Sequence, residues 1–100
     1  MDSTIETYVN NSDLLKNYEE YKRTNLSSNV LSKYERTAII GTRATQLSEG
    51  AQPLCEVPKD SDSVVDIAKK ELTERKLPFI IKRTLNNHID YWKLEDLIYN

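Results

Sequence analysis

The spacing of apolar residues changes along the chain, and it predicts two helices followed by a β-hairpin. From Ser32, apolar residues recur every three or four positions, which is typical of one face of a helix. The same spacing returns from Val64 to Leu72 and must end before Pro78, whose ring disfavours helical geometry at the preceding residue. Beyond Pro78 the residues are β-branched and alternating, which predicts strands. This order predicts a small α+β domain.

The first predicted helix has signals at both ends. Ser32 and Glu35 have the S-x-x-E spacing of a capping box, in which each side chain bonds the other residue's backbone N–H. Gly50 suits the left-handed conformation that ends many helices, and Pro53 follows it. Gly41 lies inside the helix, where glycine costs about 1 kcal/mol relative to alanine. We therefore expect another backbone or a large side chain to approach closely there. The predicted apolar face is Thr37, Ile40, Ala44 and Leu47.

The second helix follows a predicted extended segment, Pro53–Val57, and a predicted loop, Lys59–Ser63. Its apolar face is predicted to contain Val64, Ile67, Ala68 and Leu72. Its solvent side is predicted to contain Lys69, Lys70, Glu71, Glu74 and Arg75.

The hairpin is predicted from two strand-like runs, Phe79–Leu85 and Ile89–Leu94. Asn86 and Asn87 separate these runs, and asparagine tolerates the positive φ of a tight turn. Glu95–Tyr99 is predicted to close the chain with one helical turn.

Residues 1–30 are polar, and we interpret them as a flexible N-terminal arm in front of a domain at residues 31–100. Leu14, Leu15, Tyr18 and Tyr21 lie at helical spacing, so a short amphipathic helix can form there on a partner.

Composition excludes several classes of protein. One hundred residues suffice for one small domain, and the 14 basic residues nearly balance the 16 acidic ones. A general nucleic-acid binder needs a basic excess. The sequence lacks an apolar run that would cross a membrane and a secretory signal. A single Cys55 and a single His88 make neither a disulfide nor a zinc site. We expect a soluble, metal-free, intracellular chain.

Catalytic chemistry is not indicated. The sequence has no glycine-rich phosphate loop and no recognisable nucleophile and base. His88 is expected to be exposed at the turn, and Cys55 is expected to be a buried, inert thiol. Glu95 and Asp96 are adjacent, which suits capping of the final turn better than convergence on a substrate.

Two features leave alternatives open. Lys82 and Arg83, with Arg75 and Lys76, form either a basic patch or, as we favour, a solvated strand surface. Trp92 is either a stacking platform for a base or, as we favour, a residue of the core or of an interface.

Three segments resemble one family. KYERTAIIGTRATQLS (Lys33–Ser48) closely resembles the first-helix signature of the omega-type subunit of RNA polymerase. AKKELTERKLPFIIKRTL (Ala68–Leu85) resembles the family's second helix and following strand, and Trp92–Leu97 resembles its closing pattern. The family includes bacterial omega, archaeal subunit K and the subunit six shared by the eukaryotic nuclear polymerases.

The resemblance implies a structural role. The domain is expected to clasp segments of the largest polymerase subunit, including one near its C-terminus, and to promote assembly and stability of the core enzyme. It implies no catalytic residue, cofactor, metal, membrane contact, homo-oligomer or direct sequence-specific contact with nucleic acid. The first helix is the main expected contact. The residues expected to bind the partner are Lys33, Tyr34, Glu35, Arg36, Ile40, Gly41, Thr42, Arg43, Ala44, Gln46, Leu47, Arg83 and Trp92. A free-standing regulator that binds the polymerase transiently is the alternative.

Two features depart from the nuclear relatives. The arm is short and only mildly acidic, and the turn is Asn86-Asn87 where relatives often have a Pro-Asp-Gly type turn. Both features favour an archaeal form or one from a large DNA virus, and hence a cytoplasmic location (an archaeal cell, a viral factory or a virion) over the nucleus.

Arg36 and Arg43 lie seven residues apart, two turns along one helical face. A planar guanidinium can bridge a carboxylate and backbone carbonyls at a buried interface. Spacing alone favours solvated surface charges, and the resemblance favours interface roles.

A core of about 70 residues rarely supplies more than about 3–5 kcal/mol of folding stability, so we expect docking on a partner to stabilise the domain.

Overall fold

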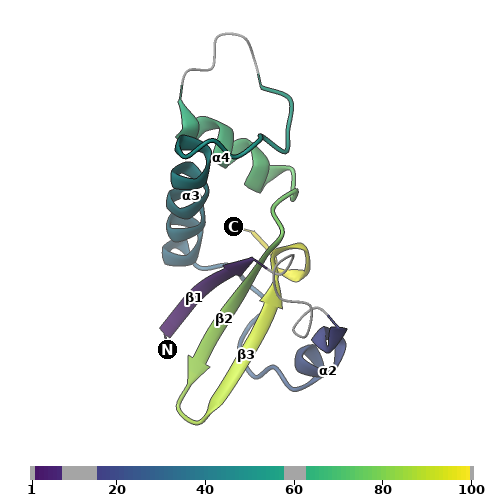
Figure 1. Ribbon diagram of the computed structural model, residues 1–100. Helices are drawn as coiled ribbons and strands as arrows, with labels where there is room; N and C mark the ends of the chain where they lie inside the picture. Colours follow the sequence, from purple (N-terminus) through teal and green to yellow (C-terminus); the bar gives the residue numbers. More distant parts are fainter. Residues whose placement is uncertain (1, 8–15, 58–62, 100) are drawn as a thin grey trace. The chain divides into compact units, whose positions relative to one another are not determined.

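The computed structural model describes residues 2–7, 16–57 and 63–99 (Figure 1). Contacts divide the chain into two compact units, which are described separately below. Unit 1 comprises Met1–Glu35 and Pro78–Asn100, so it joins the two ends of the sequence, and unit 2 is the continuous stretch Arg36–Leu77. Helices and an antiparallel sheet confirm the α+β class. The domain boundary at residue 30 stays a prediction.

Unit 1 is built on a three-stranded antiparallel sheet. Its strands are β1 (Asp2–Thr7), β2 (Phe79–Leu85) and β3 (His88–Lys93), in the order β1-β2-β3. The register places Ser3 opposite Arg83, and Arg83 opposite Asp90, so these three positions cross the sheet in one row.

The predicted hairpin is confirmed. Asn86 has a φ of 52°, which asparagine tolerates better than most residues, and it joins β2 to β3 with Asn87. The return strand begins at His88, one residue before the predicted start. The predicted closing turn is a 3-10 helix, η2 (Leu94–Asp96).

The N-terminal part of unit 1 contains more regular structure than the sequence predicted. A short helix, α2 (Tyr18–Arg23), confirms the helical spacing of Tyr18 and Tyr21, whereas Leu14 and Leu15 lie outside the described residues. Strand β1 was not predicted because its sequence, DSTIET, carries only one apolar residue. The flexibility of residues 1–30 stays a prediction.

Helix α3 (Lys33–Ser48) begins and ends as predicted. The Glu35 N–H donates to Ser32 Oγ at 3.0 Å, and the Ser32 N–H donates to Glu35 Oε1 at 3.1 Å, which completes the capping box. At the other end Gly50 has a φ of 103°. The Ala51 N–H there bonds the Gln46 carbonyl at 3.0 Å, an arrangement that caps the last turn.

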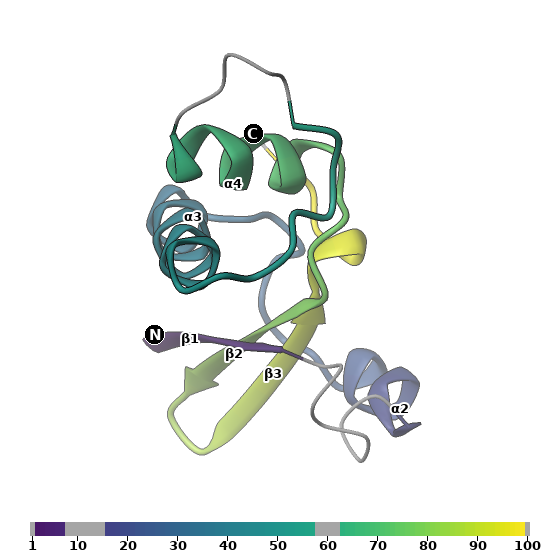
Figure 2. The ribbon, with the colours of Figure 1, turned by 45° about the horizontal axis from the view of Figure 1, so that its top comes forward.

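Helix α4 (Val64–Thr73) lies beside α3 within unit 2 (Figure 2). It ends in the same way as α3, with Arg75 at a φ of 57° and the Lys76 N–H on the Glu71 carbonyl at 3.1 Å. Glu71 is fully buried, so its predicted place on the solvent side is wrong. Pro53–Val57 forms neither helix nor strand, and most of the predicted loop Lys59–Ser63 lies outside the described residues.

Each unit has its own buried apolar residues. In unit 1 these are Tyr18, Leu31, Phe79, Ile80, Ile81, Leu94 and Leu97. In unit 2 these are Ile39, Ala44, Ala68, Leu72 and Leu77.

Candidate functional site

The residues predicted to bind a partner differ widely in exposure. Those on the surface are Lys33, Tyr34, Gly41 and Thr42, with Tyr34 at 71% exposure. Half-buried are Arg36, Ile40, Gln46, Leu47 and Trp92. Buried are Glu35, Arg43, Ala44 and Arg83. The structure therefore separates accessible candidates from charged residues that have partners inside the chain.

Arg43 is the first of these internal charges. Its Nε and Nη2 donate to the two carboxylate oxygens of Glu71, both at 2.8 Å. The remaining nitrogen, Nη1, donates to the Gln46 side chain at 3.1 Å, and Nη2 also donates to the Gln52 carbonyl at 3.0 Å. The Leu54 N–H adds a bond to Glu71 at 2.7 Å. This ion pair ties α3, α4 and the segment after α3 together, so the alternative of a solvated Arg43 is wrong.

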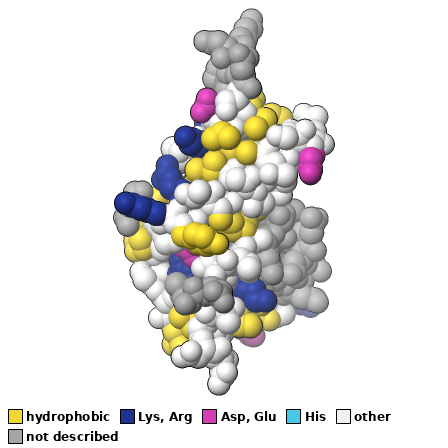
Figure 3. Space-filling view, turned by 90° about the vertical axis from the view of Figure 1, so that its left-hand side faces the viewer, with side chains coloured by type: hydrophobic (Ala, Val, Ile, Leu, Met, Phe, Trp, Pro, Cys, Tyr) yellow, Lys and Arg dark blue, Asp and Glu magenta, His cyan; other side chains and the backbone are white. Residues whose placement is uncertain are grey.

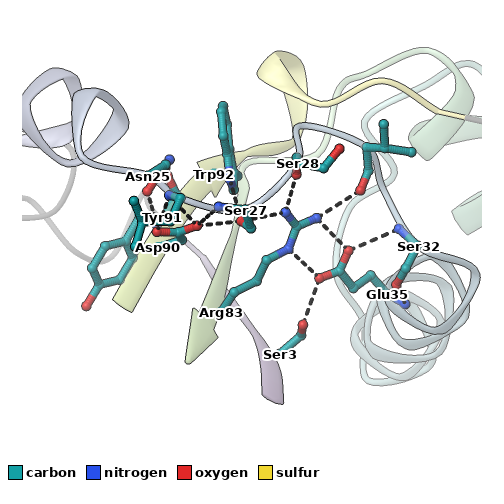
Figure 4. Close-up of polar contacts among 12 residues, drawn as sticks. Ser3, Asn25, Ser27, Ser28, Ser32, Glu35, Arg83, Asp90, Tyr91 and Trp92 are labelled. Atoms are coloured by element: carbon teal, nitrogen blue, oxygen red, sulfur yellow. Dashed lines mark hydrogen bonds and ion pairs between the residues drawn. The ribbon is translucent and has the colours of Figure 1, made fainter. Parts of the chain in front are cut away.

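Arg83 forms a second pair of the same geometry in unit 1 (Figure 4). Its Nε and Nη2 donate to the two oxygens of Glu35, both at 2.8 Å. Further donations reach Ser27 Oγ and the carbonyls of Ser28 and Val30. Arg83 is 2% exposed, so the favoured interpretation of a solvated strand surface is wrong for this residue.

The Glu35 carboxylate accepts hydrogen bonds from several donors at once. Besides Arg83 it accepts from the Ser32 N–H and from Ser3 Oγ, the latter at 2.7 Å. Burial alone would raise the pKa of its carboxyl, but the hydrogen bonds from these residues and the charge of Arg83 outweigh burial and lower the pKa to about 2. The carboxylate therefore stays ionised at any ordinary pH.

Asp90 is a third buried carboxylate, and it has no arginine partner. It accepts from the Ser27 hydroxyl, from the Ser27 N–H at 2.6 Å and from the Leu26 N–H at 3.0 Å, and His88 Nε2 lies 2.9 Å away. Burial opposes ionisation, yet these bonds and His88 keep the pKa of Asp90 below its usual value.

This cluster contains serine, aspartate and histidine, but the geometry does not suit nucleophilic catalysis. A catalytic histidine must lie between the serine and the carboxylate to accept the serine proton. Here Asp90 lies between Ser27 and His88 and accepts the Ser27 proton itself. The Ser27 oxygen also accepts from Arg83 and from Trp92 Nε1, so it carries no free nucleophilic lone pair. The arrangement holds backbone in place.

The exposed face of α3 has a different character. From Thr37 to Ser48 the only charged residue is Arg43, which is buried. The exposed residues of that stretch are Thr37, Gly41, Thr42, Thr45 and Ser48. The hydroxyls of Thr45 and Ser48 donate to carbonyls of their own helix, both at 3.0 Å. Figure 3 shows hydrophobic side chains among uncharged surface on one side of the molecule, with Lys and Arg side chains mostly toward the left edge of the view.

Helix α4 provides the contrast within the same unit. Its exposed residues include Asp66 and Lys69, and the half-buried Lys70 bonds the Glu56 carbonyl at 2.6 Å. Gly41 adds a second difference, because a Cβ at this position would meet no atom of the described residues within 4 Å. Nothing in the described part of the chain therefore explains a helix-weakening glycine at this position.

Of the other sequence candidates, Trp92 is half-buried, and its Nε1 bonds Ser27 Oγ at 3.2 Å, which agrees with packing. His88 is half-buried beside Asp90 and is less exposed than expected. Cys55 is a free, half-buried thiol, so the predicted full burial is wrong. Asp96 accepts from the Tyr18 hydroxyl at 2.6 Å, which ties the closing turn to α2.

Sequence reasoning missed the buried carboxylates of Glu71 and Asp90. Glu71 carried a signal, since it lies three residues after Ala68 and therefore on the apolar side of α4. Asp90 carried none that distinguishes it from a solvated strand residue. Within the described ranges no cluster of side chains suits a metal, and no helix is long and apolar enough to cross a membrane.

Comparisons with known proteins agree on one family. The sequence profile of the family described as RNA polymerase Rpb6 matches residues 25–79. The chain is 40% identical over 81 residues to "DNA-directed RNA polymerases II and V subunit 6B" of Arabidopsis thaliana, across 80% of this chain and 56% of that protein. It therefore spans little more than half of this relative.

Two further relatives are covered more fully. The chain is 33% identical to "DNA-directed RNA polymerases I, II, and III subunit RPABC2" of Saccharomyces cerevisiae, over 95% of this chain and 68% of that protein. It is 45% identical to "DNA-directed RNA polymerase subunit Rpo6" of Methanothermobacter thermautotrophicus, over 58% of this chain and 93% of that protein.

Proposed function

The chain belongs to the RNA polymerase Rpb6 family, and from this premise we propose that it is a non-catalytic structural subunit of a multisubunit DNA-directed RNA polymerase. In this role it clasps the largest subunit through α3 and promotes assembly and stability of the core enzyme in transcription. The compartment is that of the polymerase, and the cytoplasmic location favoured by the sequence is part of this proposal.

The uncharged exposed face of α3 is the observation that carries the proposal. A helix that faces water permanently gains solubility from charged residues, as α4 does with Asp66 and Lys69. Protein interfaces are depleted of charge at their centre, because a charge buried there must be desolvated. The stretch from Thr37 to Ser48 fits an interface centre, since its exposed hydroxyls at Thr45 and Ser48 are already bonded within the helix.

Gly41 supports the same face. Glycine weakens a helix interior, yet among residues 2–7, 16–57 and 63–99 nothing occupies the space that a Cβ would fill there. A partner backbone that packs against Gly41 would account for it. Exposed Tyr34, in the first turn of α3, adds an aromatic side chain of the kind that is enriched at interfaces.

The test compares two exposed threonines of unit 2 that have the same local environment. Thr45 on α3 donates to the Gly41 carbonyl at 3.0 Å, and Thr73 on α4 donates to the Lys69 carbonyl at 2.9 Å. Thr45→Arg places a charge at the centre of the proposed interface, whereas Thr73→Arg places one on a charged surface. Each tagged full-length variant is expressed in the native source, and the polymerase recovered with it is quantified by mass spectrometry.

We expect wild type and Thr73→Arg to recover the two largest polymerase subunits stoichiometrically after washing at high salt. Thr45→Arg should recover these subunits in an amount about tenfold smaller, or smaller still, which is typical of a disrupted interface centre. Equal recovery with both variants would remove α3 from the interface. Recovery that is substoichiometric and lost in salt, already for wild type, would indicate a transient regulator in place of a subunit.

A further inference from the structure

Leu26 combines an exposed side chain with a fixed backbone. It lies between α2 and α3 in unit 1, and its 74% exposure exceeds that of every other large hydrophobic side chain in the described ranges. A single exposed leucine is ordinary on a protein surface. The contacts around Leu26 distinguish it, because they hold its backbone in place.

The backbone around Leu26 is held by side chains of strand β3. The Leu26 N–H lies 3.0 Å from both carboxylate oxygens of Asp90, and the Ser27 N–H lies 2.6 Å from one of them. On the other side, Asn25 bonds both backbone groups of Tyr91, donating to its carbonyl at 2.7 Å and accepting from its N–H at 3.0 Å (Figure 4). Residues 25–27 are therefore fixed to the sheet.

A buried carboxylate is a costly way to hold a surface loop. Asp90 is fully buried and has no arginine partner, so its desolvation is offset by the donors of Leu26 and Ser27 and by His88. Most of these donors belong to Leu26 and Ser27. Fixing the loop before binding removes the entropy that a mobile loop would lose on binding. Tyr21, 38% exposed, is a second exposed apolar side chain held by the same strand, because its ring lies 4.9 Å from the ring of Tyr91, whose backbone Asn25 bonds.

We propose that Leu26, supported by Tyr21, is a preorganised anchor that inserts into an apolar pocket of the polymerase on which α3 docks. This inference rests on the proposed function. A stable complex buries about 800 Å² per partner, roughly 20–30 residues a side, whereas this surface consists of two side chains, 74% and 38% exposed. Leu26 and Tyr21 are therefore too few to hold two copies of the chain together. They suit a second contact within a complex that another surface already maintains, where the effective concentration is high.

The experiment measures how fast the chain leaves the polymerase. Labelled full-length chain is assembled into purified polymerase and chased with an excess of unlabelled wild type. Leu26→Ser removes the anchor, and Leu26→Met keeps its volume and apolar character. Leu54→Ser is the matched control, since Leu54 is also an exposed leucine, 42% exposed, whose N–H bonds a buried carboxylate, Glu71, at 2.7 Å in unit 2.

We expect Leu26→Ser to dissociate about tenfold faster than wild type, which is typical of the loss of a buried anchor, while Leu26→Met and Leu54→Ser dissociate at the wild-type rate. The thermal midpoint of the free Leu26→Ser chain should match wild type, because the side chain faces water in the free chain.

Dissociation of Leu26→Ser at the wild-type rate would overturn the inference, as would an equal acceleration by Leu54→Ser. Sedimentation of the free chain is measured in parallel. A dimer that Leu26→Ser converts to a monomer would also overturn the inference, because the occupant would then be a second copy. Failure of wild type to assemble with polymerase would instead overturn the proposed function.

Discussion

The two units each contain a buried arginine–glutamate pair of nearly identical geometry, and the pairs differ in what they hold. In unit 2, Arg43 makes four bonds, and they join α3 to α4 and to the segment after α3, all within one continuous stretch of sequence. In unit 1, Arg83 makes five bonds and reaches carbonyls of the segment between α2 and α3. Its partner Glu35 also caps α3 and binds Ser3 of β1.

The difference shows how each unit is closed. Unit 2 is held together by two helices that are adjacent in sequence, and its ion pair joins these two neighbouring helices at one point. Unit 1 joins the two ends of the chain, with Glu35 and Arg83 48 residues apart against 28 for Arg43 and Glu71. Long-range closure costs more conformational entropy, so unit 1 depends more on its buried polar network. The predictions below test this ranking.

The largest effect is expected from Arg83→Met. The substitution leaves the Glu35 carboxylate buried without its cation and frees the Ser28 and Val30 carbonyls, which should cost about 4–5 kcal/mol. Urea denaturation reports this directly, because the only tryptophan, Trp92, lies in unit 1 and bonds Ser27, itself a partner of Arg83.

Arg43→Met is the matched change in unit 2. We expect a smaller loss of about 3 kcal/mol, since the Arg43 side chain is 8% exposed against 2% for Arg83, and Arg43 makes four bonds where Arg83 makes five. A loss equal to or larger than that of Arg83→Met would reverse the ranking of the two pairs.

Acid should act on unit 1 through Glu35. Because the folded pKa of Glu35, about 2, lies below its ordinary value of 4.5, the ionised carboxylate stabilises the fold above pH 4.5. This contribution is lost as the pH falls from about 4.5 through about 2, and it amounts to about 3 kcal/mol. Trp92 fluorescence followed at fixed urea measures the loss. Glu35→Gln should flatten the profile in this window, and an unchanged profile would contradict the assignment.

The smallest effect is expected from Gly41→Ala in α3. No described residue lies within 4 Å of the added Cβ, so the substitution should stabilise the free chain by about 1 kcal/mol. Amide hydrogen exchange should slow in α3 more than in β2 and β3 if the units open separately. Equal slowing in α3 and in the two strands would mean that the two units unfold as one.

If a partner backbone packs on Gly41, the amount of polymerase recovered with Gly41→Ala should fall even though the free chain gains stability.

Local signals were sufficient for much of the fold. The capping box at Ser32 and Glu35, the left-handed end at Gly50, the stop before Pro78 and the turn at Asn86 all formed as predicted. Each depends on backbone geometry within a few residues, so the sequence specifies it without knowledge of the rest. The family was likewise recognisable from short segments, Lys33–Ser48 above all.

The candidate site was less accessible to sequence reasoning. Charged residues are assumed to face water, because burial without a partner is costly. Arg43, Glu71, Arg83 and Asp90 violate this assumption, and their partners are too distant in sequence for spacing to identify. The exposed face of α3 is uncharged only because Arg43 is buried, and the sequence alone does not show this.

The sequence by itself determined where the main helices and the hairpin begin and end, because propensity, capping and turn geometry are local properties. Only the tertiary structure decided which charges are internal, that Asp2–Thr7 adds a strand to β2, and that Leu26 is exposed on a fixed backbone. Those outcomes depend on pairing free energies between groups distant in sequence, and such energies exist only once the chain has folded.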